Sequence, residues 1–157
     1  MMKKATVIAS LVLSLGHVAA NASDWGVATS IGSRHIGQHD YVTCDGSARR
    51  EFNEVNPGVA VSKRITENST VEVGAYHNSI YKVSVHANVV YLPIQIGSRV
   101  KLGGQAGFVV GYCKPVPMAT AVMDVAITKG VGVQAILIPP VPNLTPAVVG
   151  LRLRFSF

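Results

Sequence analysis

Residues 147–157, AVVGLRLRFSF, decide the fold, because apolar and polar side chains alternate along them with the period of a β-strand. One face carries valine, leucine and phenylalanine, and the other carries two arginines. The apolar face consists of Val149, Leu151, Leu153, Phe155 and Phe157, and the other face consists of Val148, Gly150, Arg152, Arg154 and Ser156. A strand that presents leucine to lipid and arginine to a polar lumen has this pattern in membrane barrels.

The same alternation recurs along the chain in segments of about ten residues that are separated by turn residues. We predict eight strands at 24–36, 54–65, 70–79, 82–93, 99–112, 118–127, 131–138 and 147–157. The expected fold is therefore all-β, an eight-stranded antiparallel transmembrane β-barrel. A soluble lipocalin-like barrel is the alternative. It would reverse the two faces, and alternation alone does not distinguish inside from outside.

The lengths of the connectors predict the orientation of this barrel. Short turns follow every second strand, at 66–69, 94–98 and 128–130, as expected for turns on the periplasmic side. The remaining connectors, 39–53, 80–81, 113–117 and 139–146, include the long and proline-rich ones and are expected outside the cell. The terminal Phe157 fits the aromatic C-terminus common in barrels of bacterial outer membranes, so we expect the chain in the cell outer membrane.

The first 22 residues have the pattern of a cleaved signal peptide. Lys3 and Lys4 precede the apolar run 5–15, and Ala20-Asn21-Ala22 offers a cleavage site. The run is too short to span a bilayer, which needs about 20 residues. We therefore predict a signal peptide at 1–22 and a single barrel domain at 23–157.

Composition restricts the partners and the chemistry. The whole chain carries a formal charge of +6, and an exported basic protein is expected to meet anionic lipid headgroups rather than nucleic acid. No metal-ligand spacing, phosphate loop or nucleophile elbow occurs, so no metal or cofactor is predicted. Cys44 and Cys113 both fall in predicted outer loops, which permits a disulfide, and two free thiols are the alternative.

Two polar residues at the outer ends of strands are candidates for a functional site. Alternation puts His35 of the first strand and Ser79 of the third on the lipid-facing row, at headgroup depth. A base and a hydroxyl at that depth would suit an enzyme acting on lipid esters. The simpler interpretation is that both are ordinary rim residues.

From Glu51 to Phe157 the chain resembles the outer-membrane lipid A palmitoyltransferase family (PagP). The resemblance rests on short blocks in the same order, and it implies transfer of a palmitoyl chain from a glycerophospholipid to lipid A. The blocks are 52–54 (FNE), 57–58 (PG), 74–79 (GAYHNS), 102–110 (LGGQAGFVV), 115–117 (PVP), 138–139 (IP) and the terminal strand.

The resemblance also assigns roles. His35 is the candidate for the family's loop histidine, with His39 as the fallback, and Ser79 matches its serine. Asn78 stands where the family has aspartate, and an amide supplies no negative charge to stabilise an imidazolium. Asp40 and Glu54 are the alternative carboxylates.

The resemblance also implies that lipid enters the barrel from the side, between strands. The family interrupts strand pairing with prolines, and Pro57 and Pro139 are the matching positions, since proline removes a ladder hydrogen bond. The predicted sixth strand lacks such a proline, and the family's N-terminal amphipathic helix has no counterpart before the first strand.

Three functions remain open at this level. The first is a PagP-like acyltransferase with phospholipid and lipid A as partners, acting as a monomer. The second is a non-catalytic small barrel with a structural or interaction role. A pore is the third, although eight strands leave little lumen once side chains fill it.

Overall fold

The computed structural model describes residues 24–141 and 146–157. The predicted signal peptide at 1–22 lies outside these residues. Within them, no helix is long and apolar enough to cross a membrane.

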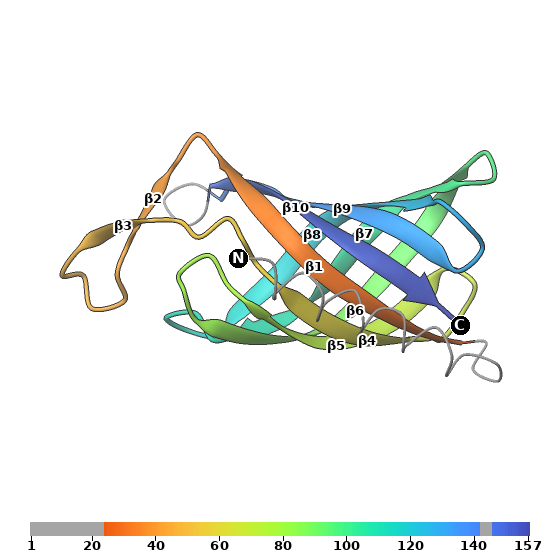
Figure 1. Cartoon of the computed structure of the whole chain (residues 1–157), viewed down its shortest axis with the longest axis horizontal. Helices are drawn as coiled ribbons and strands as arrows, with labels where there is room; N and C mark the ends of the chain where they lie inside the picture. Colours follow the sequence, from red (N-terminus) through yellow and green to blue (C-terminus); the bar gives the residue numbers. More distant parts are fainter. Residues whose placement is uncertain (1–23, 142–145) are drawn as a thin grey trace, which may run out of the picture.

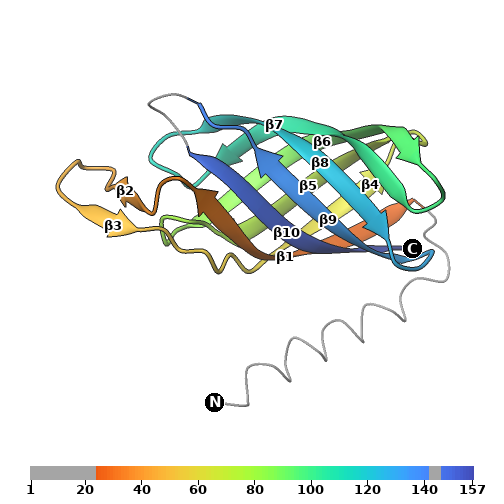
Figure 2. The same ribbon diagram turned by 90° about the horizontal axis from the view of Figure 1, so that it is seen from above.

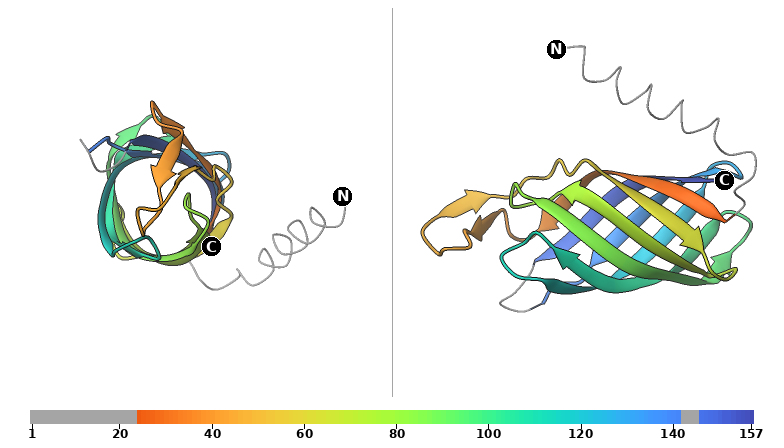
Figure 3. Two further views of the ribbon diagram at one scale, coloured as in Figure 1. Left: turned by 90° about the vertical axis from the view of Figure 1, so that its left-hand side faces the viewer. Right: turned by 90° about the horizontal axis from the view of Figure 1, so that it is seen from below.

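Eight strands close into an antiparallel barrel in the order β1-β10-β9-β8-β7-β6-β5-β4, with β4 returning to β1 (Figures 1 and 2). They are β1 (Trp25–Ile36), β4 (Gly58–Arg64), β5 (Ser69–His77), β6 (Val83–Ile96), β7 (Val100–Val110), β8 (Val116–Ala126), β9 (Val131–Ile138) and β10 (Ala147–Ser156). The predicted fold class is confirmed. Viewed along its axis the barrel is a closed ring, and a small hairpin projects from one end (Figure 3).

That hairpin consists of β2 (Asp40–Val42) and β3 (Arg49–Glu51), which pair only with each other. The prediction treated 39–53 as an unstructured connector, because strands of three residues are too short to show a period. The hairpin marks the end of the barrel that carries the long connectors, which we call the outer end. The turns at 65–68, 97–99 and 127–130 lie at the opposite end, called the turn end.

The two faces point as predicted, with apolar rows outside and polar rows inside. Val73 is 59% exposed on the outer face of β5, whereas Glu72 beside it is 4% exposed in the lumen. Leu151 and Arg152 show the same contrast on β10. The soluble-barrel alternative, which needs the reverse orientation, is therefore wrong.

Several predicted boundaries differ from the structure. The second strand starts at Gly58 and not at 54, and the third ends at His77 and not at 79. The fourth strand differs for a clear reason. We expected the fourth strand to end at 93, but β6 continues to Ile96. Its register with β7 shifts between Tyr91 and Ile94. Pro93 lies within this irregularity, and a proline has no N–H for the ladder. The strand thus passes the proline through a bulge instead of ending there.

Candidate functional site: the outer end of the barrel

His35 faces the lumen and not lipid, so its expected position on the lipid-facing row is wrong. The register of β1 against β10 shifts between Ser30 and Gly32, which makes Ile31 the extra residue of a β-bulge. One extra residue reverses the alternation for the rest of the strand. His35 therefore pairs with the buried Val148 and is 4% exposed.

The His35 ring stacks on Phe52, with centroids 3.7 Å apart and planes within 1° of parallel. Its Nδ1 atom is buried and has no hydrogen-bond partner among the described residues. Glu54, one of the alternative carboxylates, accepts a hydrogen bond from Arg34 at 2.6 Å. Desolvation opposes its ionisation, but the Arg34 bond and the backbone N–H of His35 hold the pKa of Glu54 below its usual range.

The other two alternatives from the sequence lie on the projecting hairpin or beside it. Asp40 pairs with Arg49 at 3.3 Å. His39 is exposed, and its carbonyl oxygen accepts a hydrogen bond from the Phe52 N–H. Neither side chain has a hydrogen bond to His35.

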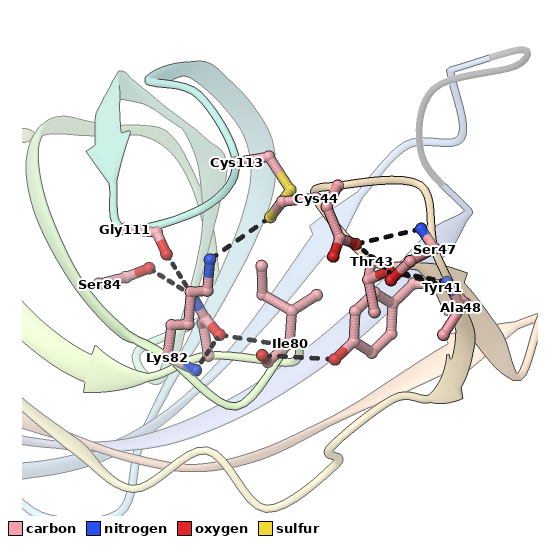
Figure 4. The surroundings of a disulfide bond; sticks show 12 residues. Tyr41, Thr43, Cys44, Ser47, Ala48, Ile80, Lys82, Ser84, Gly111 and Cys113 are labelled. Carbon is pink, nitrogen blue, oxygen red and sulfur yellow. Dashed lines mark hydrogen bonds between the residues drawn. A yellow bond between two sulfur atoms is a disulfide. The ribbon is translucent and has the colours of Figure 1, made fainter.

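The side chain of Asn78 uses both of its polar atoms to hold the turn after β5. Oδ1 accepts from the backbone N–H groups of Ile80 and Lys82, at 3.0 and 2.9 Å. Nδ2 donates to Ser84 Oγ at 2.9 Å and to the Gly111 carbonyl oxygen at 3.1 Å. The amide is fully buried. Its four partner residues, Ile80, Lys82, Ser84 and Gly111, are labelled in Figure 4. An amide can accept two bonds and donate two, so its capacity is fully used.

The turn held by Asn78 places Tyr81 in the left-handed region, at φ 61°. This conformation is uncommon for a bulky residue and is kept only where surrounding bonds impose it. Here the Asn78 N–H donates to the Lys82 carbonyl oxygen at 2.7 Å, and the Tyr81 N–H donates to the Asn78 carbonyl oxygen at 3.2 Å. The amide side chain of Asn78 is thus the centre of a structural turn.

Ser79 is also buried, at 9% exposure, because β5 ends at His77 and the chain turns inward. Its carbonyl oxygen accepts from the Asn53 N–H at 2.9 Å. Among the described residues, no hydrogen bond joins His35 to Asn78 or to Ser79. The catalytic roles suggested by the resemblance remain predictions.

The segment 52–57 completes the barrel wall between β1 and β5, above the short strand β4. On one side the Ser33 N–H donates to the Glu54 carbonyl oxygen at 2.9 Å. On the other, Asn56 Nδ2 donates to the His77 carbonyl oxygen at 3.1 Å. Asn53 Nδ2 adds a bond to His77 Nδ1 at 3.0 Å. The sequence analysis missed the asparagines of this segment. Their only signal was their density, which is typical of side chains that bond to backbone.

The two prolines proposed as lateral entrances lie in different surroundings. Pro57 immediately precedes β4, but its carbonyl oxygen accepts from the His77 N–H at 2.9 Å, so the wall beside it is closed. Pro139 follows β9, and the β8–β9 ladder stops at Ala121–Leu137. Among the described residues, 116–120 of β8 therefore have no strand partner on the β9 side. Only the Pro139 position fits a lateral opening.

Cys44 and Cys113 form a disulfide, with Cα atoms 5.2 Å apart (Figure 4). It ties the hairpin loop to the connector that follows β7. Lys82 Nζ lies 3.4 Å from Cys44 Sγ, which brings the turn after β5 to the same point. The three connectors at the outer end are thus braced together.

The lumen below this end is crossed by an ion pair. Arg152 on β10 donates to Glu72 Oε1 on β5 at 2.6 Å. Two strands separate β5 from β10 on one side and four on the other, so the bond spans the interior. His86 on β6 lies 3.3 Å from the same carboxylate oxygen. The sequence predicted inward arginines but not their partners.

A second set of bonds extends the layer towards β8 and β9. Arg152 Nε donates to Gln134 Oε1 at 2.6 Å, and Gln134 Nε2 donates to Asp124 Oδ2 at 2.5 Å. Arg154 binds both carboxylate oxygens of Asp124, at 2.7 and 3.0 Å, and also bonds to Ser156. We call these residues, with Glu72 and His86, the lumen network. It places paired charges across the lumen.

A vestibule of about 430 Å³ opens on the turn-end side of the lumen network. Its lining includes Glu67 and Lys129 from the turns, and Glu72 and Arg152 from the network. The described residues contain no group of three histidine, cysteine, aspartate or glutamate side chains arranged to hold a metal ion.

No family model and no curated protein matches the chain. Among solved structures, it is similar to the N-terminal β-barrel domain of Pseudomonas aeruginosa OprF, with a TM-score of 0.55 and 13% identity over 86% of this chain and 98% of that one. The chain has an outer-membrane type of barrel fold. Neisserial surface protein A (NspA) also matches, with a TM-score of 0.40 and 16% identity over 85% and 95% of the two chains. The resemblance to the PagP family receives no support from these comparisons.

Proposed function

We propose that this protein is a non-catalytic barrel of the outer membrane whose role is structural or lies in interactions made by its braced outer end. The observation that carries the proposal is the saturated side chain of Asn78. The residue that the resemblance places beside the catalytic histidine is committed to a turn instead. The fold similarity to the OprF barrel domain is in keeping with this function but concerns architecture alone.

The surroundings of His35 also favour a non-catalytic protein. A general base needs hydrogen-bond contact with the group that it deprotonates, and a partner that orients the ring. The ring of His35 instead stacks on Phe52. It has no hydrogen bond to a carboxylate among the described residues.

The lumen network argues against a pore. Arg152 and Glu72 meet across the interior, and Arg154 and Asp124 fill the space beside them. Paired charges in an eight-stranded barrel leave no continuous wide passage. We expect no steady conductance in planar bilayers, and a stable single-channel current would contradict this part of the proposal.

The deciding experiment is an acyl-transfer assay on the refolded protein. It uses radiolabelled phosphatidylcholine with a palmitoyl chain, purified lipid A, and an active lipid A palmitoyltransferase as the positive control. We expect neither transfer nor hydrolysis above a protein-free blank. Transfer that is abolished by His35→Ala or Ser79→Ala would overturn the proposal.

A PagP-like acyltransferase is the second candidate, because one observation favours it. Residues 116–120 of β8 lack a β9 partner near Pro139, which is compatible with lateral entry of an acyl chain. This function predicts activity in the same assay. It also predicts that added bulk near the opening, such as Ala119→Trp, slows transfer more than it lowers stability.

A further inference from the structure

Besides His35 Nδ1, four buried polar atoms on the inner wall have no hydrogen-bond partner among the described residues. They are His86 Nδ1, Asn88 Oδ1, Gln105 Oε1 and Thr120 Oγ1. Each residue is more than nine-tenths buried, at 5–7% exposure. An unpaired buried polar atom costs about 1–3 kcal/mol, and four in one wall are too many to leave without an explanation.

The register of three neighbouring strands brings these side chains onto one patch. Gln105 on β7 pairs directly with Thr120 on β8. Asn88 on β6 pairs with Gly107, whose position two residues from Gln105 puts it on the same face of β7. A Cβ added at Gly107 would lie 2.5 Å from Asn88 Oδ1, so the amide leans across the ladder towards β7. His86 precedes Asn88 on the inward row of β6.

All four atoms need a hydrogen-bond partner. The His86 Nε2 atom faces Glu72 Oε1, which can only accept, so Nε2 carries a proton and Nδ1 is the ring atom left without a partner. Asn88 Oδ1 and Gln105 Oε1 are amide acceptors, and the Thr120 hydroxyl can accept as well. Exchanging O and N in either amide leaves a buried polar atom at the same place.

The charged residues near the patch limit which molecule can bind there. Glu72 and Asp124 already pair with Arg152 and Arg154, so no free anion remains to balance a bound cation. An acyl chain would leave all four polar atoms unpaired. Water is small, neutral and donates two hydrogen bonds, and buried waters typically make about three bonds to otherwise unpaired groups.

We propose that His86, Asn88, Gln105 and Thr120 form a buried hydration site in the lumen, in which ordered water molecules form hydrogen bonds with the four unpaired atoms. Water reaches it from the vestibule. Val90 and Glu72 line the inner part of that cavity, and Val90 pairs directly with Gln105 across the β6–β7 ladder. The site therefore lies just beyond the wall of the vestibule.

The first test is Thr120→Val, which keeps the shape and the β-branching but removes the hydroxyl. The urea midpoint of the full chain is measured in lipid vesicles. If water bonds to Thr120, the midpoint falls, because the water loses a partner. If the wall is dry, removing an unpaired hydroxyl leaves the midpoint unchanged or raises it, and the proposal is overturned.

A control shows that the assay can detect a misplaced hydroxyl. Val122 lies two residues further along the same face of β8 and is 2% exposed. Val122→Thr places a hydroxyl of the same size at a buried position that now holds an apolar side chain. The urea midpoint of Val122→Thr is expected to fall, because the variant buries a hydroxyl. A matching fall for Thr120→Val and Val122→Thr confirms that the urea assay detects both the loss and the gain of a hydroxyl.

The second test is direct and does not depend on folding yield. A high-resolution crystal structure of the unmodified protein should show water density within hydrogen-bond distance of at least two of the four atoms. Density for an alkyl chain, or a dry patch with the four side chains turned to other partners, would overturn the proposal.

Discussion

Asn78 Nδ2 donates a hydrogen bond to the carbonyl oxygen of Gly111 over 3.1 Å, and this bond joins the turn after β5 to the end of β7. Gly111 adopts φ 104°, and a Cβ there would meet the backbone of Val83 and Ser84. Only glycine permits this approach. Asn78 supplies a donor to this carbonyl oxygen, and an aspartate carboxylate at position 78 could not.

The first prediction concerns Asn78→Asp. The change brings in a buried charge and removes the two bonds donated by Nδ2, so it should destabilise the protein by about 3 kcal/mol or more. Urea unfolding in lipid vesicles measures this loss. Asn68→Asp, at an exposed position of the turn between β4 and β5, is the control and should cost less.

The same variant separates the two functional proposals. If Asn78 marks a damaged catalytic site, the Asn78→Asp variant should restore acyl transfer by supplying the missing negative charge. We expect no activity. Acyl transfer by the Asn78→Asp variant would show that the site is catalytic and would contradict the structural proposal.

The second prediction concerns the ion pair across the lumen. Arg152→Met leaves Glu72 buried without its strongest partner, and such a loss typically costs about 3–5 kcal/mol. Replacing both partners, with Arg152→Met and Glu72→Gln together, should recover most of the stability. Arg34→Met breaks an exposed pair and should cost at most about 1 kcal/mol.

The third prediction concerns the disulfide. The bond closes a loop with a sequence separation of 69 residues, and a cross-link of this length stabilises by up to about 4 kcal/mol. Cys44→Ser with Cys113→Ser should lower the urea midpoint and expose the hairpin loop to protease. Equal cleavage rates with and without the bond would show that it does not brace the outer end.

The fourth prediction is a pH dependence in the hairpin loop. The Thr43 hydroxyl at 2.6 Å and the Ser47 N–H at 3.1 Å bind the carboxylate of Asp45 and lower its pKa from 3.8 to about 2. A lowered pKa stabilises the loop above pH 3.8, and this contribution is lost as the pH falls through about 2. The Ser47 amide resonance should titrate with that midpoint, whereas a midpoint near the ordinary aspartate value would show that the bonds do not form.

The fifth prediction tests which face meets lipid. Val73 is exposed in the middle of β5, so Val73→Arg would place a charge in hydrocarbon and should cost about 2–4 kcal/mol in bilayers. The matched control is Ile65→Arg in the turn between β4 and β5, where the cost should be about 0–1 kcal/mol. Equal effects at the two positions would contradict a membrane-spanning barrel.

The candidate site could be predicted only in part. Alternation grouped Arg152 and Arg154 on one face of the last strand, because a strand keeps its faces as long as its register is regular. The same rule failed for His35, since the bulge at Ile31 leaves no mark in the residue pattern. It also gave no hint that Asn78 would have Ser84 and Gly111 as partners, because those bonds join three separate segments.

The sequence by itself determined the alternating strands, the residues that share each face and the end at which the long connectors lie. These properties follow from local periodicity and turn chemistry, which each segment carries on its own. The tertiary structure alone decided that Glu72 meets Arg152, that residues 52–57 fill the wall, and that His35 stacks on Phe52. Such contacts depend on closure of the ring, which brings residues up to 80 positions apart together across a shared lumen.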